Sequence, residues 1–474
     1  MEHDSKVADD LRATGWIGHL RATVALAIPL AGASIGQMAI NITDTVMVGR
    51  LGATELAATV LATQAFFLLF IFGVGSAQAV MPLVANAIGR SDAAGVRSSV
   101  RMGLWVLALY AAAVMLPLWH LEAILLALGQ EEKIAALASD YMRVAQWGLL
   151  PALFTMGLRS YLAAVGKANV AMWMSFALVG LNAGLNYAFI FGNLGAPALG
   201  IVGAAVASIG TKLAGALWLF LYTHRSRDLR SYDLYARFWR PAWPAFAEVV
   251  RLGWPIGLMV VAEVGLFTAT SVMAGWLGTI PLAAHGIALQ LTSVAFMVPI
   301  GVASAATVRV GIAHGRGEPV AVARAGWTAV LLAAVFGGVS ALVFWLTPEP
   351  LVALFLDSDD ASAPDVVRAA IPMVYVAAAF QIADGIQAVS AGMLRGLKDT
   401  RIPMFIAVTS YWLVGLPAAY WLAFVADVGA VGVWLGLAVG LTLAAVLLTR
   451  RFAVASRMPA PHAAAAPPAP APAP

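Results

Sequence analysis

The stretch PLAGASIGQMAINITDTVMVGRLG at residues 29–52 recurs as PIGLMVVAEVGLFTATSVMAGWLG at residues 255–278. The match continues without a gap, so that residues 29–92 align with residues 255–318 at a constant shift of 226. Two glycine pairs, Gly75 with Gly301 and Gly89 with Gly315, keep the same register. A repeat of this length indicates a duplicated module, and parallel duplication of hydrophobic bundles is typical of membrane transporters.

The composition indicates that the chain lives in a lipid bilayer. Hydrophobic residues make up 61% of it and charged residues only 11%, whereas a soluble domain carries about 25% charge. The net charge of +4 is not gathered into a basic patch with interleaved aromatics, so no nucleic-acid partner is expected. The chain has no cysteine, which excludes disulfides, iron-sulfur clusters and thiolate metal sites.

Twelve apolar segments are each long enough to span a membrane as a helix of about 20 residues. They lie at residues 22–48, 54–82, 101–121, 134–157, 168–191, 199–223, 248–275, 281–308, 325–346, 367–393, 402–424 and 429–449. Six plus six agrees with the duplication and predicts an all-α membrane protein with two pseudo-symmetric six-helix lobes. The expected parts are a cytoplasmic segment 1–20, a lobe 21–223, a connector 224–247, a lobe 248–451 and a disordered Ala/Pro-rich tail 452–474.

The distribution of basic residues predicts the orientation, because positively charged connections resist translocation. Of the 28 Lys and Arg residues, 23 fall in the alternate set of connections that contains both termini. We therefore expect a multi-pass plasma (inner) membrane protein with both termini in the cytoplasm.

Four ionisable residues lie well inside predicted spans, where each costs about 2.5 to 3.5 kcal/mol to insert and is a functional candidate by default. They are Asp44, Lys212, Glu263 and Asp384. Asn41 and Gln37 precede Asp44 by three and seven residues, so the three side chains share one helical face that should line a cavity. The repeat aligns Gln37 with Glu263, which places an acid on the same face of the first helix of each half.

The tenth segment carries a second carboxylate for the second half of the chain. Asp384 follows Phe380 and Gln381 at helical spacing. If Asp384 meets Glu263, both cannot cheaply stay ionised in a low dielectric, so the pair should hold a proton or share a cation, with Na+ possible there. Either state is a coupling mechanism.

Several other polar residues each have more than one reading. Asn182 and Asn186, four apart on the fifth segment, either donate side-chain hydrogen bonds to Asp44 or only join helices. Lys212 would snorkel, neutralise a carboxylate or repel cations from one lobe. His285 would relay protons or be hydrogen-bonded between helices, and the second reading is favoured.

The chain resembles the multidrug and toxic compound extrusion transporters, close to their NorM-type branch, over nearly all of residues 20–450. The resemblance rests on DTVMVGRLG (44–52), VANAIGR (84–90), LNAGLNYAFIFG (181–192), EVGLF (263–267), LAAHGIALQ (282–290) and SAGMLRGLKDTRIP (390–403). It implies two six-helix lobes, related by a pseudo-two-fold axis along the membrane normal, that open alternately to either side.

The resemblance also implies roles for particular residues. Asp44 matches the first-helix aspartate of the amino-terminal lobe, and Glu263 and Asp384 match the cation site of the other lobe. Where sodium-coupled relatives place a tyrosine one turn before that aspartate, this chain has Phe380. Sodium wants several oxygen ligands, so the departure favours proton coupling, although sodium stays open.

The expected function is export of amphipathic, often cationic compounds in exchange for inward H+ or Na+. The chain lacks a phosphate-cradling GxxxxGK[ST] loop, so ATP is not the expected energy source, and no catalytic set argues for an enzyme. A flippase of a lipid-linked precursor remains the alternative, although its cavity should be more basic. We expect no cofactor, small-molecule drugs or toxins, a coupling cation and the bilayer as partners, and a monomer.

Overall fold

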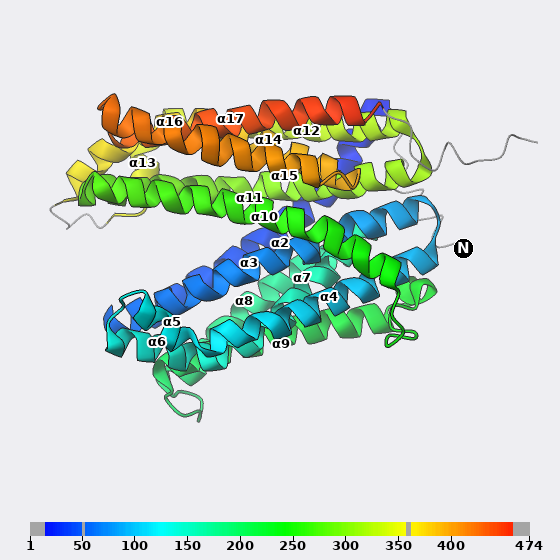
Figure 1. The fold of residues 1–474 in the computed structure, drawn as a ribbon, viewed down its shortest axis with the longest axis horizontal. Coiled ribbons are helices and arrows are strands. Elements are labelled where there is room, and N and C mark those ends of the chain that lie inside the picture. Colours follow the sequence, from blue (N-terminus) through cyan, green and yellow to red (C-terminus); the bar gives the residue numbers. More distant parts are fainter. Residues whose placement is uncertain (1–14, 50–52, 357–361, 458–474) are drawn as a thin grey trace, which may run out of the picture.

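The computed structural model describes residues 15–49, 53–356 and 362–457, and the described residues form helices without any β-strand. Figure 1 shows them as two bundles lying one above the other. The first bundle contains α2 (Gly15–Gly49), α3 (Ala53–Gly89), α4 (Ala93–Trp119), α5 (Leu121–Ala127), α6 (Glu132–Ala145), α7 (Leu149–Ala164), α8 (Ala168–Phe191) and α9 (Gly200–Arg225). The second contains α10 (Trp243–Trp276), α11 (Thr279–Arg316), α12 (Pro319–Leu346), α13 (Pro348–Ala353), α14 (Ala363–Gly396), α15 (Arg401–Val408), α16 (Leu416–Tyr420) and α17 (Ala430–Ala455). The all-α fold of two six-helix lobes is therefore confirmed.

The duplication seen in the sequence sets the helix boundaries. A shift of 226 residues carries α3 onto residues 279–315, and α11 covers Thr279–Arg316. The two helices also meet each other. A side-chain carbon placed on Gly89 would lie 2.9 Å from the Cα atom of Gly315, its own repeat partner, and one placed on Gly311 would lie 2.9 Å from Cβ of its partner Ala85. Repeat partners touch only beside a two-fold axis, so the pseudo-symmetry axis runs between α3 and α11.

Eleven helices of the described part are long and apolar enough to cross a membrane. The fourth predicted segment, 134–157, is not one continuous helix, and this expectation is corrected. A 3-10 turn, η1 (Gln146–Gly148), separates α6 from α7. Pro151 in the first turn of α7 has no N–H to continue an α-helical ladder from α6, and its ring would clash with the carbonyl four residues earlier in a regular α-helix. The fourth span is therefore a broken helix.

The eleventh segment is continuous but irregular. Two π-helical stretches, η3 (Thr409–Gly415) and η4 (Trp421–Val425), flank α16. Pro417 lies between them and cannot donate a backbone hydrogen bond. Wide turns of this kind turn side chains away from the register of a regular helix, and they are frequent at functional sites.

Some predicted boundaries differ from the structure. Helix α17 continues to Ala455, so the first residues of the expected tail 452–474 are helical, because the Phe452 ring is buried and packs edge-to-face on Trp327. Helices α2 and α10 begin at Gly15 and Trp243, five or more residues before the predicted spans. The connector contains a short 3-10 helix, η2 (Arg227–Tyr232). Residues 1–14 and 458–474 lie outside the described part.

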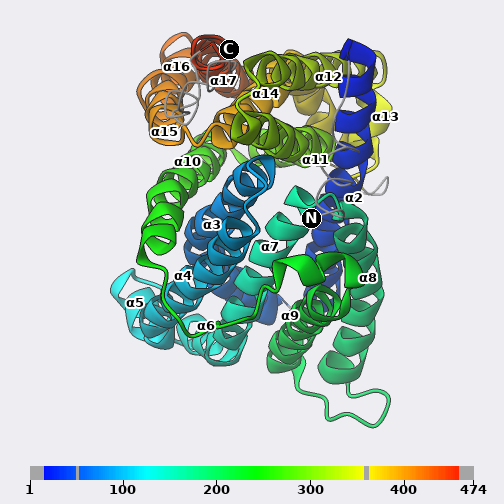
Figure 2. The same ribbon diagram turned by 90° about the vertical axis from the view of Figure 1, so that its right-hand side faces the viewer.

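The lobes meet at one end of the bundle, which we call the terminal face because it carries the start of α2 and the end of α17 (Figure 2). There Arg309 of α11 donates to the Oγ1 atom of Thr23 at 2.6 Å and to the His19 carbonyl of α2. Asn86 of α3 donates to the carbonyl of Gly396 of α14 at 2.9 Å. The hydrophobic core also continues across both lobes at this end. The terminal face is thus closed by polar and apolar contacts between the lobes.

Candidate functional site: two carboxylate clusters, one in each lobe

The first cluster surrounds Asp44 on α2. One carboxylate oxygen, Oδ1, accepts hydrogen bonds from the Nδ2 atoms of Asn182 at 2.9 Å and Asn186 at 2.7 Å, both on α8. The other oxygen, Oδ2, accepts from the Ser208 hydroxyl of α9 at 3.1 Å. We call these four residues the amino-terminal carboxylate site. Three neutral donors hold the carboxylate in place without cancelling its charge.

The amide donors of this site follow from helix geometry. Asn182 and Asn186 are four residues apart, so both face α2 from the same side of α8, and both are fully buried. The sequence reading that they donate to Asp44 agrees with these distances. Ser208 was not anticipated, and its only sequence signal is that it precedes Lys212 by one helical turn. Gln37 and Asn41, expected on the same face as Asp44, are exposed and form no side-chain hydrogen bond to it among the described residues.

Lys212 stands close to this site. Its ammonium lies 4.5 Å from the centroid of the Phe66 ring of α3, within cation–π distance. It lies within electrostatic reach of Asp44. The two charges are nevertheless not in direct contact, because no ion pair within 4.0 Å joins them in the described structure. Of the three sequence readings, the neighbouring charge favours neutralisation of a carboxylate.

The second cluster surrounds Asp384 on α14. Asp384 is only 3% exposed to solvent. Glu263 of α10 lies within electrostatic reach of Asp384. The two acids that the sequence places on separate helices therefore come together inside the second lobe. Tyr411, from the π-helical η3, is fully buried and lies within electrostatic reach of both carboxylates. We call Glu263, Asp384, Tyr411 and Gln387 the carboxy-terminal carboxylate site.

Polar atoms of the carboxy-terminal carboxylate site lack partners. The Oδ1 atom of Asp384, both side-chain polar atoms of Gln387 and the Tyr411 hydroxyl are buried without a hydrogen bond among the described residues. Buried polar atoms are normally paired, and each unpaired one costs about 1 to 3 kcal/mol. Such a group of oxygen and nitrogen atoms fits a proton, water or a small cation. Tyr411 also supplies a hydroxyl from another helix at a site where Phe380 lacks one.

A cavity of about 310 Å³ opens next to Asp384 between α10, α11 and α14. Phe267, Phe296 and Phe380 form aromatic walls, and Ser271 and Thr292 add hydroxyl groups. The Phe380 ring packs edge-to-face against two other rings. Its centroid lies 6.2 Å from that of Phe267 and 5.6 Å from that of Trp434. Aromatic faces beside a carboxylate suit a lipophilic organic cation, because both attract positive charge.

The remaining predicted residues lie around this cavity with structural partners. Gln381 donates to the backbone carbonyl of Thr292 at 3.0 Å, which ties α14 to α11. The Nε2 atom of His285 shares a 3.1 Å hydrogen bond with the Ser271 hydroxyl of α10. The second sequence reading of His285, a histidine bonded between helices, agrees with this contact.

Arg395 connects the carboxy-terminal carboxylate site with the other lobe. It lies within electrostatic reach of Glu263 and also donates from its guanidinium to the Oε1 atom of Gln78 on α3. Sequence reading placed Arg395 only among the basic residues of a connection. Its two partners come from helices far apart in the chain, so periodicity could not have found them.

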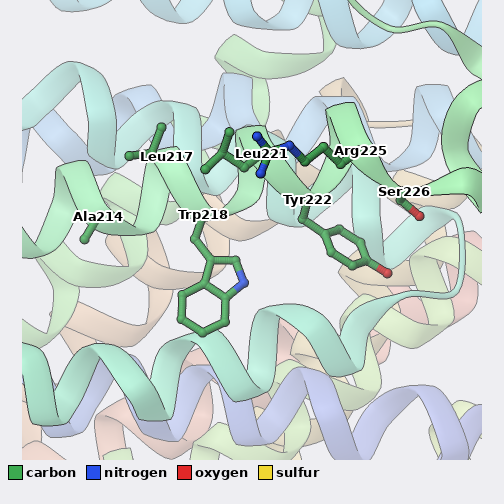
Figure 3. Close-up of a pocket in the computed structure, with 7 residues that line it drawn as sticks. All are labelled: Ala214, Leu217, Trp218, Leu221, Tyr222, Arg225 and Ser226. Atoms are coloured by element: carbon green, nitrogen blue, oxygen red, sulfur yellow. The ribbon is translucent and has the colours of Figure 1, made fainter.

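An open apolar groove elsewhere on the molecule does not fit a cation site. Figure 3 shows it on α9, with Trp218 and Tyr222 pointing to the same side of the helix. Its lining contains Arg225 and no carboxylate. A cationic compound would be repelled by the guanidinium, so the chemistry favours the cavity at Asp384 even though this groove is roomier.

Comparison with known proteins places this geometry in a family. The MatE family model matches residues 29–188 and again residues 255–421, starting at the prolines that open the two repeats. A relative from Rhizobium meliloti (strain 1021), "Probable multidrug resistance protein NorM", is 50% identical over 92% of this chain and 94% of its own length. "Multidrug resistance protein NorM" of Burkholderia vietnamiensis is 40% identical, with 92% and 94% covered.

Solved structures share the fold at lower identity. "Crystal structure of MATE in complex with MaL6" superposes with a TM-score of 0.86 at 21% identity, covering 95% of this chain and 99% of that one. "Crystal structure of eukaryotic MATE transporter AtDTX14" gives 0.81 at 22% identity, with 94% and 98% covered. Since a family model matches both halves and close relatives match nearly the full length, the chain belongs to the MatE family of multidrug and toxic compound extrusion transporters.

Proposed function

We propose that the protein is a secondary active multidrug exporter of the plasma (inner) membrane. It expels amphipathic, often cationic organic compounds and admits H+ or Na+ in exchange. In this proposal the protein works as a monomer without a cofactor or ATP, with both termini in the cytoplasm. The names of its relatives, multidrug resistance proteins, support the class of compound.

One observation carries the proposal: the buried carboxylate of Asp384, with Glu263 within electrostatic reach and unpaired polar atoms nearby, lines an aromatic cavity. Asp384 belongs to both the carboxylate site and the cavity wall. A cationic compound in the cavity and a coupling cation at Glu263 and Asp384 therefore compete for the same negative charge. Binding of one favours release of the other, which is the chemical basis of exchange.

Exchange also requires that the two ligands prefer different conformations, because a ligand that binds both equally shifts no population. The terminal face is closed here by Arg309, Asn86 and Arg395 contacts between the lobes. With the termini in the cytoplasm, this is the outward-facing state. Arg395 lies within electrostatic reach of Glu263 and donates a hydrogen bond to Gln78 of the other lobe. Binding of a cation at Glu263 therefore changes the charge next to an inter-lobe contact that must break when the lobes move apart.

The test is a gradient-swap assay in proteoliposomes without ATP. The proposal predicts that an imposed proton or sodium gradient, directed as in the cell, drives ethidium transport in the opposite direction. Each gradient is also applied alone, with the other ion at the same concentration on both sides. The gradient that drives ethidium transport under these conditions identifies the coupling ion. The absence of dye movement under both gradients, with protein shown to be folded and correctly inserted, would refute the exporter.

A further inference from the structure

We propose that Lys212 is a tethered cation for the amino-terminal carboxylate site. Its ammonium takes at Asp44 the place that an external cation takes at Glu263 and Asp384. The inference rests on the proposed exchange function and assigns different cations to the two lobes. It predicts that only the carboxy-terminal carboxylate site consumes an ion from the gradient.

The position of Lys212 on its helix brings the ammonium within reach of Asp44. Ser208 and Lys212 are four residues apart, so they share one face of α9 about 6 Å apart along the axis. Ser208 already touches the Asp44 carboxylate at 3.1 Å. The flexible four-carbon stem of lysine bridges one further turn. In this proposal, a rotamer change of Lys212 brings its ammonium to the carboxylate while the backbone stays in place.

The Lys212 ammonium has only weak contacts in the position that the structure shows. The charge lies over the Phe66 ring at 4.5 Å and has no hydrogen-bond acceptor or ion-pair partner among the described residues. Gly148 of η1 provides the room for the stem, because a side-chain carbon there would lie 3.0 Å from Cδ of Lys212. A cation–π contact stabilises an ammonium by less than its removal from water costs. The nearby Asp44 charge supplies the missing compensation.

No ion pair of Asp44 with a cationic side chain is present among the described residues. Asp44 accepts three hydrogen bonds from neutral groups, and Lys212 and Tyr141 of α6 lie within electrostatic reach of it. The carboxylate and the ammonium are therefore each other's counter-ions across a short gap. The proposal gives the ammonium two positions: over Phe66, where the structure has it and where it leaves Asp44 open to a cationic compound, and at the Asp44 carboxylate.

The first experiment measures cation binding and needs no transport. Purified wild type, Lys212→Met, Lys212→Arg, Asp44→Asn and the Asp44→Asn/Lys212→Met double variant are placed in nanodiscs. Their thermal unfolding midpoints are recorded over a series of Na+ concentrations and a series of pH values. Lys212→Met should gain a cation-dependent rise in the midpoint that wild type lacks, because Asp44 then recruits an external ion. Lys212→Arg should behave as wild type, and the double variant should lose the gained dependence.

The same variants test whether the two charges compensate each other. The double variant should regain most of the stability that either single variant loses, because removing both members of a compensating pair leaves no lone buried charge. If Lys212→Met does not fold but the double variant does, the proposal is supported. Losses that simply add, or a Lys212→Met protein whose midpoint responds to cations as wild type does, would overturn it.

A transport readout separates this inference from the proposed function. In proteoliposomes, the initial rate of ethidium transport against the concentration of the driving cation should have a Hill slope near one in wild type and rise toward about two in Lys212→Met. An unchanged slope in Lys212→Met counts against the tethered cation and leaves the exporter standing. Wild-type protein that does not transport the dye at all refutes the exporter, whereas the nanodisc measurement still decides the role of Lys212.

Discussion

At the residue scale, Asp384 is a buried acid, whereas Asp44 and Glu263 are half-buried. The Asp44 carboxylate accepts hydrogen bonds from three neutral donors, whereas the Oδ1 atom of Asp384 has no hydrogen bond among the described residues. The two sites therefore differ in kind despite the duplication. Both oxygens of the Asp44 carboxylate are paired with protein groups, and the carboxy-terminal carboxylate site has room for an added proton or cation.

Replacing an acid of the carboxy-terminal carboxylate site should abolish coupling. Asp384→Asn and Glu263→Gln keep the shape of each side chain but remove the charge that both the coupling cation and a cationic dye need. We expect gradient-driven efflux to fall to the level of empty vesicles. Glu248→Gln is the matched control, because Glu248 lies on the same helix as Glu263 but pairs with Lys398 at 2.8 Å. Efflux that persists in both site variants would exclude these acids from the mechanism.

Removing the Tyr411 hydroxyl should weaken cation binding without unfolding the protein. Tyr411 is fully buried and its hydroxyl makes no hydrogen bond of normal geometry to another described residue, although Gln387 lies close to it. Tyr411→Phe therefore removes a poorly satisfied polar atom and leaves the packing intact. The thermal midpoint should be equal to or higher than that of wild type, while a higher concentration of the driving cation is needed for half-maximal efflux. A variant with a lower midpoint and unchanged cation dependence would make Tyr411 a packing residue only.

Local periodicity predicted only part of these sites. Donation from Asn182 and Asn186 to Asp44 was one of two readings of the sequence, because their four-residue spacing shows only that they share a helical face. Ser208, Tyr411 and Arg395 could not be assigned to a site, since their partners are set by which helices pack together. The contact between Ser208 and Asp44 spans 164 residues and that between Arg395 and Gln78 spans 317.

At the element scale, helix identity was predictable and helix regularity was not. All twelve apolar segments are helical in the described structure, and eleven of them form helices long and apolar enough to cross a membrane. The fourth is interrupted at Gln146–Gly148, and the eleventh is partly π-helical. Both irregular elements contribute to the two carboxylate sites. The turn η1 places Gly148 beside Lys212, and η3 places Tyr411 near Glu263 and Asp384. Hydropathy indicates only whether a segment is apolar enough to span a membrane. It does not detect a 3-10 or π-helical turn within that segment.

Crowding the pseudo-symmetry axis should prevent closure of the terminal face. A side-chain carbon on Gly315 would lie 3.1 Å from the Cα atom of Asn86 in the other lobe, where only backbone could yield. We expect Gly315→Leu to shift the protein to the state that is open at the terminal face. Ser76 of α3 packs against Gly253 of α10 in the other lobe, where a side-chain carbon on Gly253 would lie 2.8 Å from the Ser76 Oγ atom. Because the chain has no native cysteine, Ser76→Cys can report separation of the lobes by maleimide labelling.

The control for this experiment lies on the same helix. Gly286→Leu adds the same side chain where a new carbon meets no atom within 4 Å. Labelling of Ser76→Cys should therefore rise several-fold in the Gly315→Leu background and stay unchanged in the Gly286→Leu background. Equal labelling in both would show that the α3–α11 crossing does not control access.

At the scale of the whole molecule, the duplication predicted most of the architecture. Two matching modules imply two lobes and an axis between them, and the contact of Gly89 with its repeat partner Gly315 places that axis. Which end is closed could not be predicted, because both states use the same sequence and differ only in contacts between the lobes. Those contacts involve side chains, such as Arg309 and Thr23, that no local pattern pairs.

The central claim is that the buried carboxylates of the second lobe exchange a coupling cation for a cationic compound. Its most direct test is to record dye efflux and cation influx together in the same proteoliposomes, using ethidium fluorescence with a lumenal pH or sodium indicator. We predict that wild type moves both in a fixed ratio and that Asp384→Asn loses both fluxes together. Dye efflux that continues without cation entry, in wild type or in Asp384→Asn, would contradict the account.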